Sequence, residues 1–190
     1  MNIENRLRFN LLLDLIGDLE KDIRTIDAIT RHSPYDIPRD SGVYAFWWIG
    51  DRRKLLAAST HIILVGPGGK EVNVQFTEWW PNSLKYPCLY VGKSTNLRKR
   101  FGQHLMRGSR GRVHTIPANG RKQKAATTAC QLRYGIEHIF PKESKPLDLI
   151  ARDVGFSFKV YAAEDIAERF FQEDLLIGTL RPWFNVDSER

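Results

Sequence analysis

One short stretch, CLYVGKSTNLRKRFGQH at residues 88–104, gathers side chains that suit phosphate chemistry. A strand-like run breaks at Gly92 and passes into an expected helix that carries lysine and arginines. Tyr90 provides a hydroxyl group, Arg100 a guanidinium group and His104 an imidazole group. Arg100 and His104 lie four residues apart, so they are neighbours on a helix. Because guanidinium groups fork onto phosphate oxygens, we expect this turn to handle phosphate.

Positive charge is concentrated around this stretch. The whole chain has a net charge of +7, and residues 79–136 contain no aspartate or glutamate. The basic residues of that segment are Lys85, Lys93, Arg98, Lys99, Arg100, Arg107, Arg110, Arg112, Arg121, Lys122, Lys124 and Arg133. A block of one sign repels itself unless a polyanion is near, which favours a phosphate-rich partner; a solvated basic face is the alternative. Charge alone does not separate DNA from RNA, or an enzyme from a binding protein.

A glutamate interrupts an apolar helical face near the C-terminus. The run EDIAERFFQEDLLIGTL predicts a helix that Pro182 stops, and Glu173 falls on its apolar stripe. The other members of the stripe are Ile166, Phe170, Ile177 and Leu180. Burying a carboxylate costs on the order of several kcal/mol unless a cation or metal compensates it. An ion pair with an arginine, or a place at the margin of the core, is the alternative to a metal site.

The remaining patterns predict the elements that position these residues. Apolar residues spaced three and four apart predict one long helix over the first thirty residues, which docks on its own domain or on a second copy. That stripe consists of Phe9, Leu12, Ile16, Leu19, Ile23 and Ile26. Strands are expected at residues 42–50, 88–92 and 156–163, and a hairpin at residues 61–76. Ser94 or Thr95 is expected to cap the following helix, on which Leu97, Phe101 and Leu105 make an apolar face. Residues 125–140 are also expected to be helical.

Composition bounds the class of protein. A chain of 190 residues with 42% hydrophobic residues suits one domain with embellishments and a buried core. No apolar run approaches the roughly 20 residues that span a bilayer, and the N-terminus lacks a signal-peptide pattern, so we expect a soluble cytoplasmic protein with no membrane partner. Cys88 and Cys130 are too few for a disulfide framework and lack zinc-site spacing, which favours two buried thiols.

Five pieces in order carry a resemblance to a known family. They are GVY at residues 42–44, YVGK at residues 90–93, Arg100 and His104 ten and fourteen residues after Tyr90, and EDLLIGTLRPWFN, in which Glu173 precedes Asn185 by twelve residues. This pattern resembles the GIY-YIG nuclease superfamily, and its last piece is similar to the nuclease domain of UvrC repair proteins. The 45 residues between Tyr44 and Tyr90 exceed the spacing in compact relatives and look like the insertions of GIY-YIG restriction endonucleases.

The resemblance implies an α+β fold with a small central antiparallel sheet flanked by helices. It implies an N-terminal helical arm at residues 1–38 and a nuclease domain at residues 39–190, with loop or hairpin insertions at about 51–86 and 107–150. It also implies an active site on the sheet surface. The catalytic positions carried over are Tyr44, Tyr90, Lys93, Arg100, His104, Glu173 and Asn185, with Glu173 as the metal ligand.

The implied reaction is hydrolysis of a phosphodiester bond. Glu173 would hold Mg²⁺ or Mn²⁺, since such an ion tolerates a single carboxylate and keeps most of its waters. Arg100 would stabilise charge on the phosphoryl oxygens. Tyr44 would act as general base, although its ordinary pKa of about 10 requires nearby cations or a metal-bound water to help. Tyr90 and His104 would hydrogen bond water or phosphate, whereas a strand tyrosine can also be a plain core residue.

The sequence therefore favours a divalent-metal-dependent endonuclease of restriction type that acts on duplex DNA as a homodimer, without a small-molecule cofactor. Repair or mobile-element nicking, a catalytically silent nucleic-acid-binding module, and a structural partner protein that uses the N-terminal stripe are the alternatives. The residues expected to grip nucleic acid are Arg98, Lys99, Arg107, Arg110, Arg112, Arg121, Lys122 and Lys124. Trp47, Trp48, Trp79 and Trp80 either stack on bases or pack in the core.

Overall fold

Strand β2 (Gly42–Trp48) is the centre of the fold. All seven of its residues are buried. It pairs antiparallel with β5 (Cys88–Ser94) on one side and with β6 (Val154–Val160) on the other. A strand that is covered on both faces needs apolar residues at nearly every position, which GVYAFWW provides. The expected central strand at this place is confirmed.

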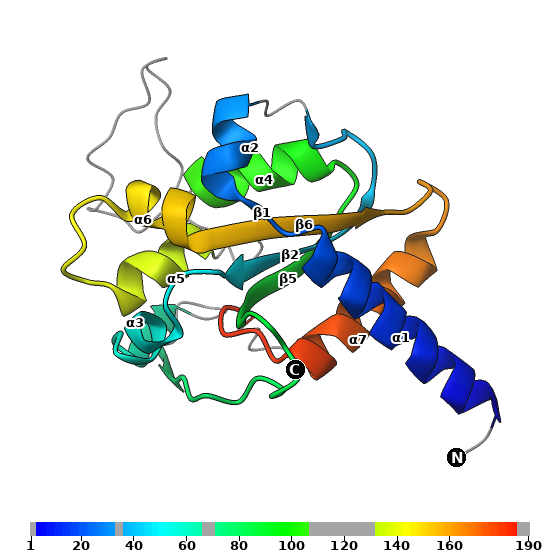
Figure 1. Ribbon diagram of the computed structural model, residues 1–190, viewed down its shortest axis with the longest axis horizontal. Coiled ribbons are helices and arrows are strands. Elements are labelled where there is room, and N and C mark those ends of the chain that lie inside the picture. The colour runs from blue at the N-terminus through cyan, green and yellow to red at the C-terminus, as the bar shows by residue number, and fades with distance from the viewer. Residues whose placement is uncertain (1–2, 33–35, 66–70, 107–131, 186–190) are drawn as a thin grey trace.

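The computed structural model describes residues 3–32, 36–65, 71–106 and 132–185, and Figure 1 shows their arrangement. A short strand, β1 (Arg24–Thr25), completes an open four-stranded antiparallel sheet in the order β1, β6, β2, β5. Helices flank this sheet, so the chain is α+β with a small antiparallel sheet, as expected. No helix of the described residues is long and apolar enough to cross a membrane.

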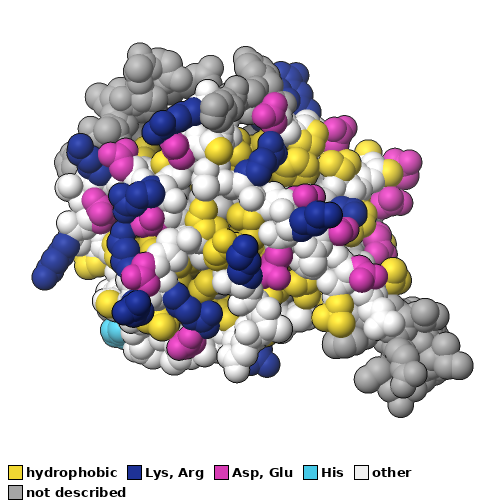
Figure 2. All heavy atoms as spheres, in the orientation of Figure 1, with side chains coloured by type: hydrophobic (Ala, Val, Ile, Leu, Met, Phe, Trp, Pro, Cys, Tyr) yellow, Lys and Arg dark blue, Asp and Glu magenta, His cyan; other side chains and the backbone are white. Residues whose placement is uncertain are grey.

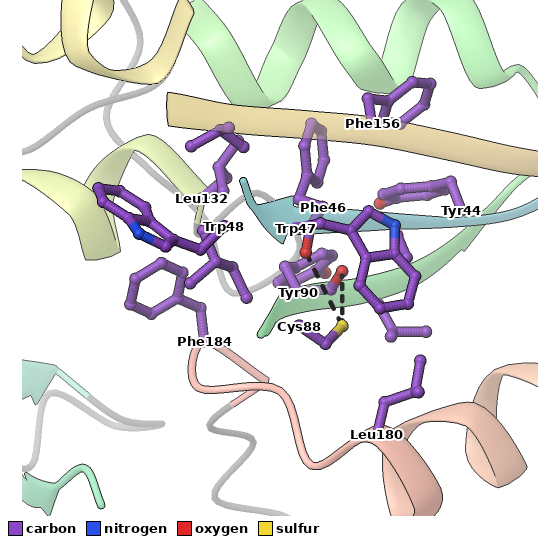
Figure 3. Close-up of a cluster of buried hydrophobic side chains, with 14 of the residues drawn as sticks. Tyr44, Phe46, Trp47, Trp48, Cys88, Tyr90, Leu132, Phe156, Leu180 and Phe184 are labelled. Carbon is purple, nitrogen blue, oxygen red and sulfur yellow. Dashed lines mark hydrogen bonds between the residues drawn. The ribbon is translucent and has the colours of Figure 1, made fainter. Parts of the chain in front are cut away.

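Helices cover both faces of the sheet (Figure 1). The helices are α1 (Ile3–Lys21), α2 (Ile26–His32), α3 (Arg52–Leu56), α4 (Leu97–Met106), α5 (Leu132–Ile139), α6 (Pro146–Asp153) and α7 (Ile166–Leu180). Helix α4 packs on β2 and β5 from one side, and α7 packs on the same strands from the other. Figure 3 shows this division, with Phe46 and Phe156 on the α4 side and Trp47 on the side of Leu180 in α7.

The single N-terminal helix expected from the sequence is wrong, because the helix ends at Lys21. Arg24 and Thr25 instead pair with Phe156 and Gly155 of β6. Gly155 allows this approach, since a Cβ atom there would lie 2.4 Å from the Cγ2 atom of Ile23. The stripe docks on its own chain, with Leu12, Ile16, Leu19 and Ile26 in the core. The expected boundary near residue 38 stays a prediction, while β1 joins the N-terminal segment to the central sheet.

The segment between β2 and β5 carries α3 and a hairpin outside the central sheet. The expected hairpin is confirmed as β3 (His61–Val65) and β4 (Glu71–Gln75), which make a two-stranded sheet of their own. Aromatic stacking ties this segment to the C-terminal residues: the ring centroid of Trp183 lies 5.0 Å from that of Phe76 and 4.6 Å from that of Trp80. Trp47, Trp48 and Trp80 are buried and Trp79 is partly buried, which agrees with core packing.

The expected insertion at about residues 107–150 is described only from residue 132. Helix α5 confirms the C-terminal half of the helix expected at residues 125–140. Cys88 is buried as expected, with its Sγ atom 3.8 Å from the carbonyl oxygen of Phe46 (dashed in Figure 3), and Cys130 lies outside the described residues. Burial raises the pKa of the Cys88 thiol well above its ordinary value, so this thiol stays protonated and unreactive.

Candidate active site

The turn between β5 and α4 is set by side-chain hydrogen bonds to the backbone. The Oδ1 atom of Asn96 accepts the Lys99 N–H at 2.9 Å and caps the helix. The Oγ atom of Ser94 accepts the Asn96 N–H at 2.9 Å and so shapes the turn. The expected cap at Ser94 or Thr95 is wrong. Strand β5 runs to Ser94 and helix α4 begins at Leu97, so the capping position falls on Asn96.

Helix α4 buries the expected face and extends it to His104. Its buried residues are Leu97, Phe101 and His104, whereas Leu105 is only partly buried. Arg100 lies one turn before His104 and is partly exposed. The His104 ring packs on Phe46, with a centroid distance of 4.9 Å. An imidazole therefore joins Leu97 and Phe101 in the core, at a position that the sequence placed on a neighbouring face of the helix.

Two tyrosines meet His104 on the α4 side of the sheet. The hydroxyl of Tyr44 lies 2.9 Å from the Nε2 atom of His104, and the ring centroid of Tyr90 lies 4.7 Å from that of His104. Tyr44 stands opposite Gly92 in the strand register. A Cβ atom on Gly92 would lie 2.4 Å from the Tyr44 hydroxyl. The phenol ring of Tyr44 can therefore pack here only because residue 92 has no side chain. All three side chains are buried.

Lys93 and Glu173 form an ion pair at the outer edge of β5. The Nζ atom of Lys93 contacts the Oε2 atom of Glu173, and the Lys93 backbone N–H donates to Oε1 at 3.1 Å. The Lys93 ammonium also lies 3.7 Å from the ring centroid of Phe170, one turn earlier on α7. The carboxylate expected on the apolar stripe is therefore compensated by a cation, but by a lysine rather than an arginine. The role of Phe170 was missed, although it shares the stripe with Glu173.

Asn185 binds the same strand edge. Its Oδ1 atom accepts the Val91 N–H and its Nδ2 atom donates to the Val91 carbonyl oxygen, each at 2.7 Å. Asn185 and Glu173 together satisfy outward-facing backbone groups of β5, which is the edge strand of the sheet. Both residues thus have a structural role in closing this edge. Nothing in the local sequence signals that role, because the partners are more than 75 residues apart.

The tyrosine cluster and the ion pair meet at Gly92 and Lys93. The Tyr44 hydroxyl lies against Gly92 from the α4 side, while Glu173 accepts a hydrogen bond from the next amide along the strand. The site thus draws on β2, β5, α4, α7 and the residues after α7, with the side chains of Tyr44, Tyr90, Lys93, His104, Glu173 and Asn185. Arg100 belongs to the same helix as His104, one turn away.

Two of the described basic residues of the positive segment bind groups of the fold itself. The Nε atom of Arg98 donates to the Ile37 carbonyl oxygen at 2.7 Å, and buried Arg133 pairs with Glu137. Lys99 is exposed. On the face shown in Figure 2, Lys and Arg side chains are mixed with Asp and Glu. The other residues expected to grip nucleic acid, Arg107, Arg110, Arg112, Arg121, Lys122 and Lys124, lie outside the described residues.

The donor set fits a divalent cation with a single protein ligand. Within the described part of the chain, no three acidic, histidine or cysteine side chains gather into a metal-binding group. Glu173 offers one largely buried carboxylate, and an ammonium group already sits where a cation is favoured. Mg²⁺ accepts such an arrangement because it keeps most of its waters.

Comparison of the chain with protein-family models, with curated proteins and with solved structures gives no match.

Proposed function

We propose that this protein is a divalent-metal-dependent endonuclease that hydrolyses DNA phosphodiester bonds, with a fold of the GIY-YIG type. The observation that carries the proposal is the convergence at Gly92 and Lys93. A hydroxyl bonded to an imidazole and a carboxylate bonded to an ammonium approach two successive residues of one strand. These groups cover the tasks of phosphodiester hydrolysis, namely proton transfer, charge neutralisation and cation binding.

Each residue has a part in this proposal. The Nε2 atom of His104 exchanges a proton with the Tyr44 hydroxyl, because this imidazole is its hydrogen-bonding neighbour and both groups are screened from bulk water. Arg100 neutralises charge on the phosphate, and Tyr90 hydrogen bonds the phosphate or the attacking water. A divalent ion held by Glu173, Mg²⁺ or Mn²⁺, supplies Lewis acidity when bound. Asn185 holds the edge of β5 on which these groups depend.

The partner proposed is duplex DNA, cut by two copies of the chain, because one active site of this kind cuts one strand. A restriction-type role is the version favoured by the enlarged segment between the two tyrosine motifs. A second candidate is a silent nucleic-acid-binding module of the same fold. It is favoured by the structural contacts of Glu173 and Asn185, which explain both residues without catalysis.

Cleavage of supercoiled plasmid in Mg²⁺ distinguishes the two candidates. The Glu173→Gln variant keeps an oxygen acceptor for the Lys93 amide but removes the charge, and we expect nicking to fall at least about 100-fold. DNA binding should persist. Glu168→Gln removes the same charge from an exposed place on α7 and serves as control. Equal cleavage by the two variants would refute the assignment, and a wild type that binds but never nicks would favour the binding module.

The ends of the products test the restriction-type role. Sequencing should give discrete ends at recurring positions if the protein reads a sequence. Random nicks would instead assign it to a nicking function without sequence preference.

A further inference from the structure

We propose that Lys93 is a built-in counter-ion that a divalent cation must displace from Glu173, so that metal binding frees the Lys93 ammonium for a phosphate group. This inference rests on the proposed function, because it concerns the same cation site. It assigns Lys93 and Phe170 a role in regulating that site.

The contacts of Lys93 show how tightly the ammonium is held. Its Nζ atom contacts Glu173 Oε2, while its own backbone N–H donates to Oε1 of the same carboxylate at 3.1 Å. The ring of Phe170 covers the ammonium from another side, at 3.7 Å to the centroid. Phe170 and Glu173 lie three residues apart on one face of α7. Helix α7 thus presents a carboxylate and an aromatic face to one lysine.

The ammonium and a metal ion compete for one place. The side chain of Glu173 is only 11% exposed, so it has little surface left for a second cation. Like charges at contact distance repel strongly in such a partly buried setting. A divalent ion can therefore bind the carboxylate only after the ammonium has moved away.

The ammonium has a route outward. The Lys93 side chain is 26% exposed and Phe170 is 52% exposed, so the lysine lies at the surface of the pair. A phosphate group at this surface attracts the ammonium away from the carboxylate and leaves Glu173 open to the metal. By linkage, phosphate and metal then favour each other's binding.

Binding of Mn²⁺ alone, measured from the signal of free Mn²⁺ in electron paramagnetic resonance, tests the competition. The Lys93→Met variant should bind Mn²⁺ about tenfold more tightly than wild type. The Lys93→Met, Glu173→Gln double variant should lose this gain, because the carboxylate is gone. Affinity in Lys93→Met equal to or weaker than that of wild type would overturn the inference.

A milder pair of variants keeps the test decisive if Lys93→Met does not fold. Phe170→Ala removes the aromatic face but leaves the ion pair, and should raise Mn²⁺ affinity about twofold to fivefold. Phe171→Ala removes a neighbouring exposed ring and should leave the affinity unchanged. Identical affinities in these two variants would contradict a role for Phe170 in holding the lysine.

The outcome is separable from that of the nuclease proposal. Tighter Mn²⁺ binding by Lys93→Met in a protein that never nicks DNA would support the competition and reject the nuclease. Glu173-dependent nicking together with unchanged Mn²⁺ affinity in Lys93→Met would do the reverse.

Discussion

At the scale of single residues, Gly92 controls the candidate site by its lack of a side chain. We expect Gly92→Ala to displace the Tyr44 hydroxyl, because the new Cβ atom would lie 2.4 Å from it. Overpacking of this kind typically costs about 1–3 kcal/mol. The variant should unfold at a lower urea concentration than wild type, and its plasmid nicking should be slower.

Gly102 on α4 provides the matched control. A Cβ atom there meets nothing within 4 Å, so Gly102→Ala should stabilise the helix by about 0.5–1 kcal/mol. If Gly92→Ala proves as stable and active as Gly102→Ala, the packing described around Tyr44 is incorrect.

Arg181 is a second residue at which the backbone conformation determines how a substitution changes stability. It ends α7 in the left-handed region, with φ of 48°, where a non-glycine side chain costs about 1 kcal/mol. Arg181→Gly should therefore raise the free energy of unfolding by about 1 kcal/mol in urea titrations, relative to Arg181→Ala, which keeps the strain. A glycine variant less stable than the alanine variant would mean that the conformation at residue 181 is not left-handed.

Residue types in the site could be predicted, but residue partners could not. The apolar stripe of α7 indicated that Glu173 needs a cation, and that expectation holds. The cation is Lys93, which is 80 residues away in sequence and therefore invisible to a pattern read along one helix. The same limit applies to His104, whose burial depends on Tyr44 and Phe46 from a strand 60 residues earlier.

At the scale of elements, Asp153 joins helix α3 to the end of α6. Its carboxylate accepts from Lys54 Nζ at 2.7 Å and from Arg152 Nε at 2.9 Å. Burial opposes ionisation of Asp153, but these two cations outweigh it and hold its pKa below the ordinary value. A lowered pKa in the folded state means that ionised Asp153 adds stability above about pH 4, and that this contribution is lost as the pH falls through the folded pKa.

Asp153→Asn should therefore destabilise the protein at pH 7 by about 1–3 kcal/mol in denaturant unfolding. The difference from wild type should shrink as the pH is lowered from 4 toward 3. Asp18→Asn removes an exposed ion pair with Lys159 and should cost less than about 0.5 kcal/mol at any pH. A stability loss in Asp153→Asn that does not change with pH would contradict the pKa direction.

Periodicity predicted the elements that depend on neighbouring residues. It failed for a strand that depends on pairing with a distant segment. The hairpin β3–β4 and the helix α7 follow from alternation and 3.6-residue spacing within one window. The break after α1 does not, because β1 exists through its hydrogen bonds to β6, 130 residues later. Ile23 and Ile26 fit the helical stripe, so the sequence around them does not indicate a change from helix to strand.

At the scale of the whole molecule, the positive charge of residues 79–136 divides into two parts. In the described part, Lys93 and Arg133 pair with glutamates and Arg98 binds a carbonyl group, so the charges of these three residues are already engaged within the chain. The excess of positive charge is visible in the sequence, but which of these charges are paired within the fold is not. Attraction of a polyanion is therefore expected to depend chiefly on the basic residues after α4.

The last prediction concerns those residues. Replacing Arg107, Arg110 and Arg112 together with alanine should weaken binding to duplex DNA equally for all sequences, because phosphate contacts carry no sequence information. If all three contact phosphates, the slope of log affinity against log salt should become shallower by about 2.7, at roughly 0.9 per phosphate contact. The measurement is fluorescence anisotropy with two unrelated duplexes across a salt series. Arg53→Ala, with a side chain 95% exposed on α3, is the control and should leave the slope unchanged. A triple variant with the wild-type slope would show that the charge of this segment is a solvated face and that the DNA partner must be sought elsewhere on the molecule.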